Sequence, residues 1–172
     1  MFDCDLDQAN GPASWYAVRV RSNFENTVST VLRGKGYQEF LPTHRSRTKT
    51  THKAIELPLF PGYVFCRLDI TKRLPVMITP GVVNFVSFGS TPCAIPDEEI
   101  EAVQQMVRSK LPVGPWPHLR AGQKILIERG PLAGLEGMLV EHKGAFRIAV
   151  SISLLQRTIV AEIDNDWVRP IK

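Results

Sequence analysis

The sequence predicts an α+β protein of two small domains: an antiparallel sheet with flanking helices, followed by a C-terminal five-stranded β-barrel. Strand-type alternation and helix-type periodicity are mixed in the first 109 residues. A proline-rich stretch follows at residues 110–119, and only short β-type segments come after it. The length of 172 residues, with 44% of them apolar, suits one or two modest hydrophobic cores.

The first half of the N-terminal domain begins with a strand and a helix. Residues 15–20 alternate as a half-buried strand does, and Ser22 to Glu25 has the pattern of a capping box that opens a helix. Gly34 and Gly36 end this helix. Its predicted buried stripe consists of Phe24, Val28, Val31 and Leu32.

The remaining elements of this domain alternate between strands and short apolar segments. A second strand is expected at residues 37–42, an exposed basic hairpin tip at 43–53, a third strand at 59–68, a short apolar segment at 74–78 and a fourth strand at 82–88. A second helix fits residues 96–109, because Asp97, Glu98 and Glu99 favour its N-terminal end. Its buried face is expected at Ile100, Val103 and Val107.

Four prolines and glycines between residues 110 and 119 predict a semi-rigid spacer and the domain boundary. The predicted organisation is a disordered tail at 1–13, a first domain at 14–109, the linker at 110–119 and a second domain at 120–172. Residues 124–127, 137–141, 146–153 and 159–163 are the predicted strands of the barrel.

Positive charge gathers in the first domain. The formal net charge is +4, yet residues 14–80 hold eleven Lys or Arg against four acidic residues. A group of exposed cations attracts nucleic-acid phosphates without reading bases. The predicted nucleic-acid-binding set is Arg19, Arg21, Arg45, Arg47, Lys49, Lys72 and Arg73, with Lys53 beside it.

The sequence contains no motif for catalysis. It lacks both standard phosphate-binding glycine loops, the His-Glu-x-x-His pair and the Gly-x-Ser-x-Gly elbow, so we expect no enzyme. Cys4, Cys66 and Cys93 include no Cys-x-x-Cys pair, so we expect reduced thiols, no metal and no cofactor. The acidic N-terminus and the lack of a long apolar run predict a soluble, cytoplasmic protein that contacts no membrane.

An aromatic run around a Pro-Gly pair is the most informative local feature. Phe60 and Tyr63 flank Pro61 and Gly62, and strict alternation would place the two rings out of phase. A bulge at the Pro-Gly pair would turn both rings outward, because Pro61 cannot donate to a ladder and Gly62 permits an unusual backbone. This pattern predicts a contact surface, whereas Trp15 is expected in the core.

Three segments together resemble the NusG family of transcription elongation and antitermination factors. They are Trp15-Tyr16-Ala17-Val18, Leu59-Phe60-Pro61-Gly62-Tyr63-Val64-Phe65 and the KOW-type stretch Gly130-Pro131-Leu132-Ala133-Gly134-Leu135-Glu136-Gly137. The resemblance covers residues 14–172. It implies the family's N-terminal α+β (NGN) domain, an SH3-like barrel as the second domain, and a monomeric factor that acts on transcribing RNA polymerase.

The resemblance also implies two binding surfaces in the first domain. RNA polymerase would be gripped through the clamp helices of its largest subunit, by Tyr16, Phe60, Tyr63, Ile78 and Phe85. Arg21 stands where a basic residue after the first strand contacts the non-template DNA strand near the bubble.

The C-terminal domain departs from the housekeeping pattern. NusG carries Ile-Phe-Gly-Arg in the loop that engages termination factor Rho or a small-subunit ribosomal protein, whereas this chain has Leu154-Leu155-Gln156-Arg157. The change argues against Rho and points to a specialised RfaH-like or UpxY-like paralogue, with Leu154, Leu155 and Arg157 as the partner-binding residues. A housekeeping NusG-type factor is the alternative, and a ribosome- or RNA-binding KOW module is the alternative of another class.

A resemblance to RfaH-type proteins implies a further possibility. In these proteins the C-terminal domain covers the polymerase site as a helical hairpin and refolds to a barrel on release. β-branched residues between Ile148 and Val160 favour strands, and Gly134, Gly137 and Gly144 would each cost a helix roughly 1 kcal/mol. We therefore expect an independently folded barrel in the free protein.

Overall fold

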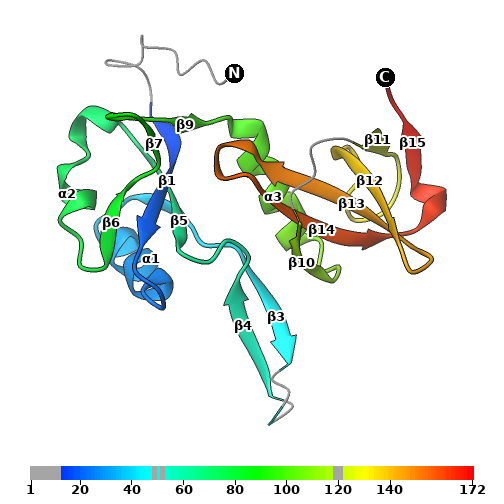
Figure 1. Cartoon of the computed structure of the whole chain (residues 1–172), viewed down its shortest axis with the longest axis horizontal. Coiled ribbons are helices and arrows are strands. Elements are labelled where there is room, and N and C mark those ends of the chain that lie inside the picture. Colours follow the sequence, from blue (N-terminus) through cyan, green and yellow to red (C-terminus); the bar gives the residue numbers. More distant parts are fainter. Residues whose placement is uncertain (1–12, 48–49, 51–52, 118–121) are drawn as a thin grey trace. The chain divides into compact units, whose positions relative to one another are not determined.

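The computed structural model describes residues 13–47, 50, 53–117 and 122–172. The chain divides into two compact units (Figure 1). One unit contains the residues up to Leu41 together with Phe60–Asp97, and the other contains Pro42–Leu59 with Glu98–Lys172. All but the last residue of the predicted tail, and the predicted site residue Lys49, lie outside the described residues.

The first unit is built on an antiparallel sheet in the order β2-β5-β1-β6, with β9 also paired to β1. Its strands are β1 (Ser14–Val20), β2 (Gln38–Phe40), β5 (Tyr63–Leu68), β6 (Val82–Phe85) and β9 (Ala94–Ile95). β1 lies where the alternation predicts it, and Tyr16, Val18 and Val20 join the core that includes Val28 and Leu32 of the helix α1 (Glu25–Gly34). The expectation of a half-buried strand is wrong over residues 15–18, where Trp15 and Ala17 on the other face are buried as well. The predicted α+β domain with an antiparallel sheet is therefore confirmed.

The predicted capping box at the start of α1 is wrong. Phe24 is the N-cap and no side chain caps the helix, and the Glu25 carboxylate accepts a hydrogen bond from the Gly62 backbone N–H. Phe24 is exposed, and the buried side of α1 consists of Glu25, Val28, Ser29 and Leu32. The helix ends as expected at the glycines: Gly34 is its last residue and Gly36 has a φ of 85°.

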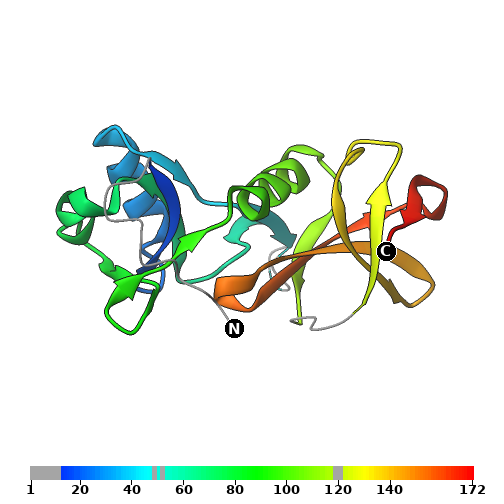
Figure 2. The same ribbon diagram turned by 90° about the horizontal axis from the view of Figure 1, so that it is seen from above.

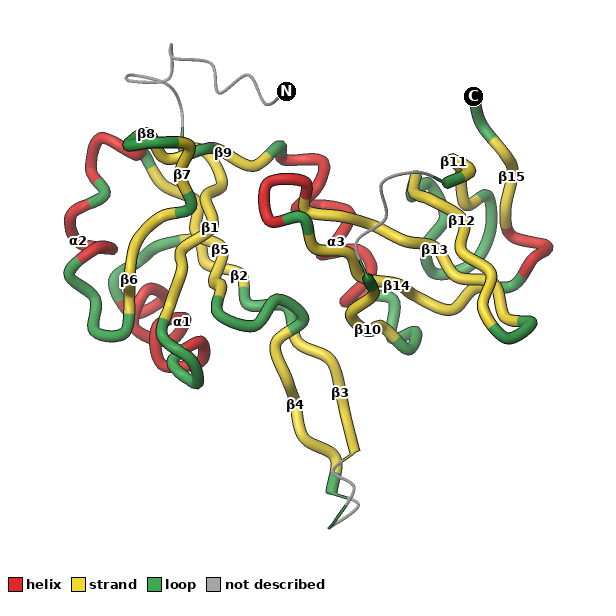
Figure 3. Tube along the Cα trace, viewed as in Figure 1, coloured by secondary structure: helices red, strands yellow, loops and turns green. Residues whose placement is uncertain are grey.

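The basic hairpin forms a separate two-stranded sheet (Figure 3), made of β3 (Thr43–Arg47) and β4 (Ala54–Pro58). The third predicted strand starts at Tyr63 rather than at residue 59, because residues 59–62 form the preceding turn. The fourth is interrupted after Phe85. A second small hairpin follows from β7 (Ser87–Phe88) and β8 (Thr91–Pro92).

Two short helical segments lie between β5 and β6. They are the 3-10 turn η2 (Ile70–Lys72) and the helix α2 (Leu74–Met77), which occupies the predicted short apolar segment. Thr79 closes this region by donating its hydroxyl hydrogen to the carbonyl oxygen of Pro75. The chain then continues from α2 into β6, which pairs with β1.

The helix α3 (Asp97–Arg108) matches the second predicted helix but buries a partly different face. Ile100, Val103 and Met106 are buried, whereas Val107, predicted in that face, is only half-buried. Within the second unit, the Glu99 carboxylate accepts hydrogen bonds from the backbone and hydroxyl of Ser153, and the Gln105 amide donates to the Ala133 carbonyl. Figure 2 shows α3 beside these C-terminal strands.

The C-terminal strands form one antiparallel sheet in the order β10-β14-β13-β12-β11-β15. They are β10 (Val113–Trp116), β11 (Gln123–Ile127), β12 (Glu136–His142), β13 (Ala145–Ile152), β14 (Arg157–Ile163) and β15 (Val168–Pro170), with the 3-10 turns η3 (Ser153–Leu155) and η4 (Asn165–Trp167) between them. The four predicted strands and the β-rich fold are confirmed. Residues 136–163 contain no α-helix.

The predicted spacer at residues 110–119 is wrong for β10. Its residues pair antiparallel with β14, from Val113 opposite Ala161 to Trp116 opposite Thr158. Proline is tolerated there because β10 is an edge strand, where a missing N–H need not interrupt a ladder. Trp116 of β10 packs edge-to-face on His142, and the Arg147 guanidinium lies 5.5 Å from the centre of the Trp116 ring.

Within the described part of the chain, no helix is long and apolar enough to cross a membrane.

Candidate functional site

The Pro-Gly pair in the aromatic run forms a tight turn between Phe60 and Tyr63. The Tyr63 N–H donates to the Phe60 carbonyl at 3.1 Å, and Gly62 has a φ of 87°, the geometry of a type II turn. Two longer-range hydrogen bonds fix the turn. The Gly62 N–H donates to Oε1 of Glu25 at 2.9 Å, and its carbonyl accepts from the Val20 N–H at 2.8 Å.

This turn separates the two predicted contact rings. The expectation that both rings turn outward is wrong for Phe60, which is 1% exposed and packs edge-to-face on Phe65 at 5.4 Å. Tyr63 is half-buried, so solvent reaches part of the residue. The turn therefore presents one aromatic side chain and uses the other as a core anchor.

Tyr16 and Phe85 are also almost fully buried. They are 3% and 4% exposed, and their rings meet edge-to-face at 6.0 Å on the side of the sheet that faces α1. Burial, with a contribution from the nearby Asp69 carboxylate, raises the pKa of Tyr16. Of the predicted polymerase-binding residues, Tyr63 and Ile78 are the ones that solvent reaches, and Ile78 is 68% exposed.

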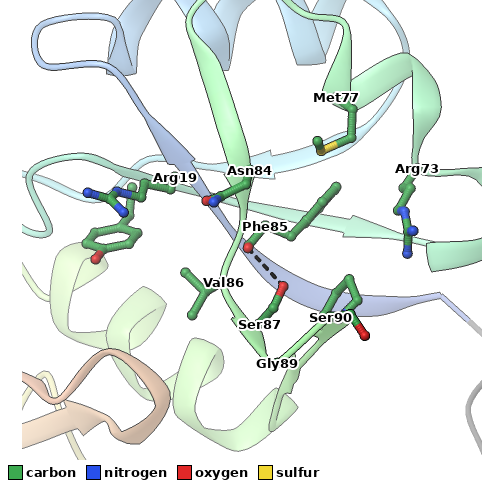
Figure 4. Close-up of a pocket in the computed structure, with 11 residues that line it drawn as sticks. Arg19, Arg73, Met77, Asn84, Phe85, Val86, Ser87, Gly89 and Ser90 are labelled. Carbon is green, nitrogen blue, oxygen red and sulfur yellow. Dashed lines mark hydrogen bonds between the residues drawn. The ribbon is translucent and has the colours of Figure 1, made fainter.

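A groove of about 430 Å³ opens beside Tyr63 (Figure 4). It is lined by Arg19, Tyr63, Arg73, Met77, Asn84 and Phe85, and by residues of the segment between Val86 and Pro92. The groove thus joins residues from both predicted sets, Tyr63 and Phe85 from one and Arg19 and Arg73 from the other. They come from β1, β5 and β6 and from the segment around α2.

Strand register explains one wall of the groove. Arg19 in β1 lies opposite Tyr63 in β5 and opposite Asn84 in β6, so the three side chains form a row across one face of the sheet. In Figure 4 the strand of Asn84 and Phe85 runs between Arg19 and Arg73, which lie on opposite sides of it. Arg73 occupies the N-cap position of α2, one turn before Met77.

The groove is electropositive. Among the described residues, no Asp or Glu lines it, and neither Arg19 nor Arg73 forms an ion pair. Its polar floor includes Ser87, whose hydroxyl donates to the Phe85 carbonyl at 3.0 Å. This arrangement is suited to bind an anionic group beside apolar surface.

The other predicted cations lie outside the groove. Arg21 and Lys72 are exposed in the first unit. Hydrogen bonds from the Thr71 side chain and backbone, together with Lys72, lower the pKa of the adjacent Asp69 carboxyl. Arg45 and Arg47 are exposed on β3 of the hairpin, which belongs to the second unit.

The predicted partner-binding residues of the C-terminal domain surround η3. Leu154 and Leu155 are half-buried in this turn, and Arg157 is exposed at the start of β14. Gln156 between them adopts a left-handed conformation, with a φ of 49°. The Ser153 N–H and hydroxyl at the start of η3 both donate to the Glu99 carboxylate of α3, which anchors the turn to this helix.

Sequence reasoning missed Asn84 and Met77 as groove residues. Both stand in segments that were identified correctly, yet their roles depend on which strands pair. The pairing of β1 with both β5 and β6 brings Asn84 next to Arg19, and no local pattern specifies that order.

The two described cysteines, Cys66 and Cys93, provide no reactive site. Cys66 is a free thiol buried in β5, where burial, with the nearby Glu39 carboxylate, raises its pKa to about 12. A thiol with so high a pKa is a poor nucleophile. The expectation of three reduced thiols is wrong for Cys93, which is disulfide-bonded.

Comparison with known proteins places this site in a family context. The family model NusG, described as transcription termination factor nusG, matches residues 13–104, more than half of the chain. The transcription termination/antitermination protein NusG of Staphylococcus carnosus is 26% identical, covering 96% of this chain and 100% of that protein. The protein of the same name from Helicobacter pylori strain J99 is 23% identical, covering 87% and 93%.

A solved structure shows the same fold. The NusG of Thermotoga maritima, from a study of its domain interaction, aligns with a TM-score of 0.56 at 22% identity and covers 93% of this chain. Its fold agrees with the sheet, helices and β-rich C-terminal part described above. The chain is therefore a transcription termination/antitermination factor rather than an enzyme, and it belongs to the NusG family.

Proposed function

We propose that this protein is an elongation and antitermination factor that binds the clamp of RNA polymerase through the groove beside Tyr63. The observation that carries the proposal is the meeting of Tyr63, Arg19 and Arg73 in one concave surface. Tyr and Arg are the residues that most often dominate the affinity of protein interfaces. Exposed Ile78 next to the groove supplies apolar area for the same contact.

Binding of this kind suppresses pausing without chemistry. A factor that binds the closed clamp more tightly than the open one shifts the polymerase toward the closed, elongating state. The size of the shift is limited by the difference between the two affinities, typically about 1–3 kcal/mol. The C-terminal domain, through Leu154, Leu155 and Arg157, would then recruit a second partner at high effective concentration.

Basic residues outside the groove provide the proposed contact with the non-template DNA strand. Arg21, Arg45, Arg47 and Lys72 are exposed and suited to phosphates, and Lys49 stays a prediction outside the described residues. Arg19 and Arg73, first predicted for the same role, line the groove with Tyr63 and join the protein-binding surface in this proposal. A small-subunit ribosomal protein is the proposed C-terminal partner, and the sequence of η3 argues against Rho.

Substitution of the groove tyrosine tests the proposal. Tyr63→Ala removes a half-buried ring, and we expect it to weaken binding to core RNA polymerase by about tenfold or more and to restore pausing. Tyr63→Phe is the matched control, because it keeps the ring and should retain most of the affinity. Binding of the folded Tyr63→Ala protein at the wild-type level would show that the groove is not the polymerase site.

A further inference from the structure

We infer that the segment of RNA polymerase that enters the groove carries at least two carboxylate side chains, which pair with Arg19 and Arg73, beside apolar residues. This inference rests on the proposed function and adds the chemistry of the partner to it. It also makes these two arginines specificity residues for a protein rather than contacts for nucleic acid.

The two groove arginines carry charges that no acidic residue of the described chain pairs with. Arg19 and Arg73 are exposed on opposite sides of the strand of Asn84 (Figure 4), and neither has an acidic partner among the residues that the structure describes. Other arginines of the described chain do have one: Arg33 pairs with Glu39 at 2.6 Å and Arg169 with Glu128 at 2.7 Å. The two groove arginines are thus available for an anion from outside the chain.

The surroundings of the two arginines select a carboxylate over a phosphate. Met77 lies one helical turn after Arg73 inside the groove. Leu74 of the same short helix and Ile78 at its C-cap are 67% and 68% exposed. A nucleic-acid backbone would leave these apolar side chains in water. A protein segment with mixed acidic and apolar residues would cover them, because interface cores favour Arg, Tyr and Met.

The shape of the groove agrees with a small protein segment. A volume of about 430 Å³ accommodates a few side chains, such as those at the end of a helix or in a tight loop. The guanidinium of each arginine can bind one carboxylate through two parallel hydrogen bonds. Asn84, in the row with Arg19 and Tyr63, adds an amide that can donate to the same segment.

The experiment measures the affinity of full-length variants for core RNA polymerase that contains no nucleic acid, at several salt concentrations. The test variant is Arg19→Gln with Arg73→Gln. Its matched control is Arg108→Gln with Arg129→Gln, which removes the same charge from exposed positions of the second unit that belong to neither proposed surface. We expect at least about tenfold weaker binding and a flatter salt dependence for the groove variant, and a change within about twofold for the control.

Three outcomes would overturn the inference. Unchanged binding of the groove variant, while Tyr63→Ala loses affinity, would leave the proposed function standing without the carboxylates. Equal losses of affinity for the groove variant and the control variant would mean that general positive charge acts, not the groove. Normal binding of the groove variant to the core enzyme, with a lower affinity for single-stranded DNA measured in parallel, would assign both arginines to phosphates. If Tyr63→Ala also binds normally, the proposed function itself fails.

Discussion

At the scale of single residues, Gly62 determines how the aromatic run is divided between core and surface. Its φ of 87° permits the turn that buries Phe60 and leaves Tyr63 at the groove. A Cβ at this position would come no closer than 4.0 Å to another atom, the carbonyl oxygen of Val20. Substitution would therefore cost backbone strain rather than a steric clash.

We expect Gly62→Ala to lower the free energy of unfolding by about 1–2 kcal/mol, because alanine is disfavoured in the left-handed region. Urea denaturation of the full chain measures this. Gly34→Ala is the matched control, since Gly34 lies in α1 at ordinary φ with no atom within 4 Å of the added Cβ. That variant should be neutral or slightly more stable. Equal stability of Gly62→Ala and the wild type would contradict the assigned turn geometry.

Cys66 offers a second test at this scale, through pH. Burial raises its pKa to about 12 in the folded state, from 9.0 for an exposed thiol. The unfolded chain therefore releases this proton first, so the stability linked to Cys66 is complete below pH 9 and falls as the pH rises toward 12. At pH 10 the free energy of unfolding should be lower by about 1 kcal/mol.

Comparison with Cys66→Ala isolates this effect. The variant is less stable at neutral pH because it leaves a small cavity, but it lacks the ionisable group. The difference in unfolding free energy between the two proteins should thus shrink between pH 8 and pH 10. A difference that stays constant over this range would show that the Cys66 thiol is not desolvated as described.

At the scale of elements, the sequence predicted what local patterns determine and failed where distant partners decide. Alternation placed β1, and Gly34 and Gly36 placed the end of α1, because both signals are local. Ser22 to Glu25 has the letters of a capping box, yet Glu25 instead holds Gly62, which lies 37 residues further along the chain. Phe60 was misplaced for the same reason, since the turn that buries it depends on this hydrogen bond.

The strand β10 shows the same limit in the second unit. Proline content predicts a spacer, whereas pairing with β14 depends on a free sheet edge that no local sequence reveals. For the candidate site too, local sequence indicates the residue types but not which of them meet. Residue types indicated Tyr63, Arg19 and Arg73 as binding residues, but only the strand order shows that they share one groove.

The contribution of β10 can be measured with two C-terminal fragments, residues 110–172 and residues 118–172. The shorter fragment lacks the ladder with β14 and the Trp116 contacts with His142 and Arg147. We expect both to show β-type circular dichroism, with the longer one more stable by about 1–3 kcal/mol. Identical melting curves would mean that residues 110–117 act as a spacer after all, and a helical spectrum would contradict the independent β fold.

At the scale of the whole molecule, the open question is whether the protein serves most genes or a few. Membership of the NusG family is compatible with a housekeeping factor and with a specialised one. In η3 the half-buried Leu154 and Leu155 occupy the positions of the Ile and the exposed Phe in the housekeeping pattern Ile-Phe-Gly-Arg. Loss of that aromatic removes a large contact area for Rho.

We therefore predict that chromosomal occupancy of this protein is enriched on one or a few long operons rather than following RNA polymerase everywhere. Crosslinking and immunoprecipitation of both proteins from the same cells measures the ratio along each gene. Phosphate contacts by the basic set cannot produce such enrichment alone, because they carry no sequence information. An enriched profile would therefore need a contact that carries sequence information, such as one to a base of the non-template strand. A constant ratio on most genes would make this chain a general elongation factor despite Leu155.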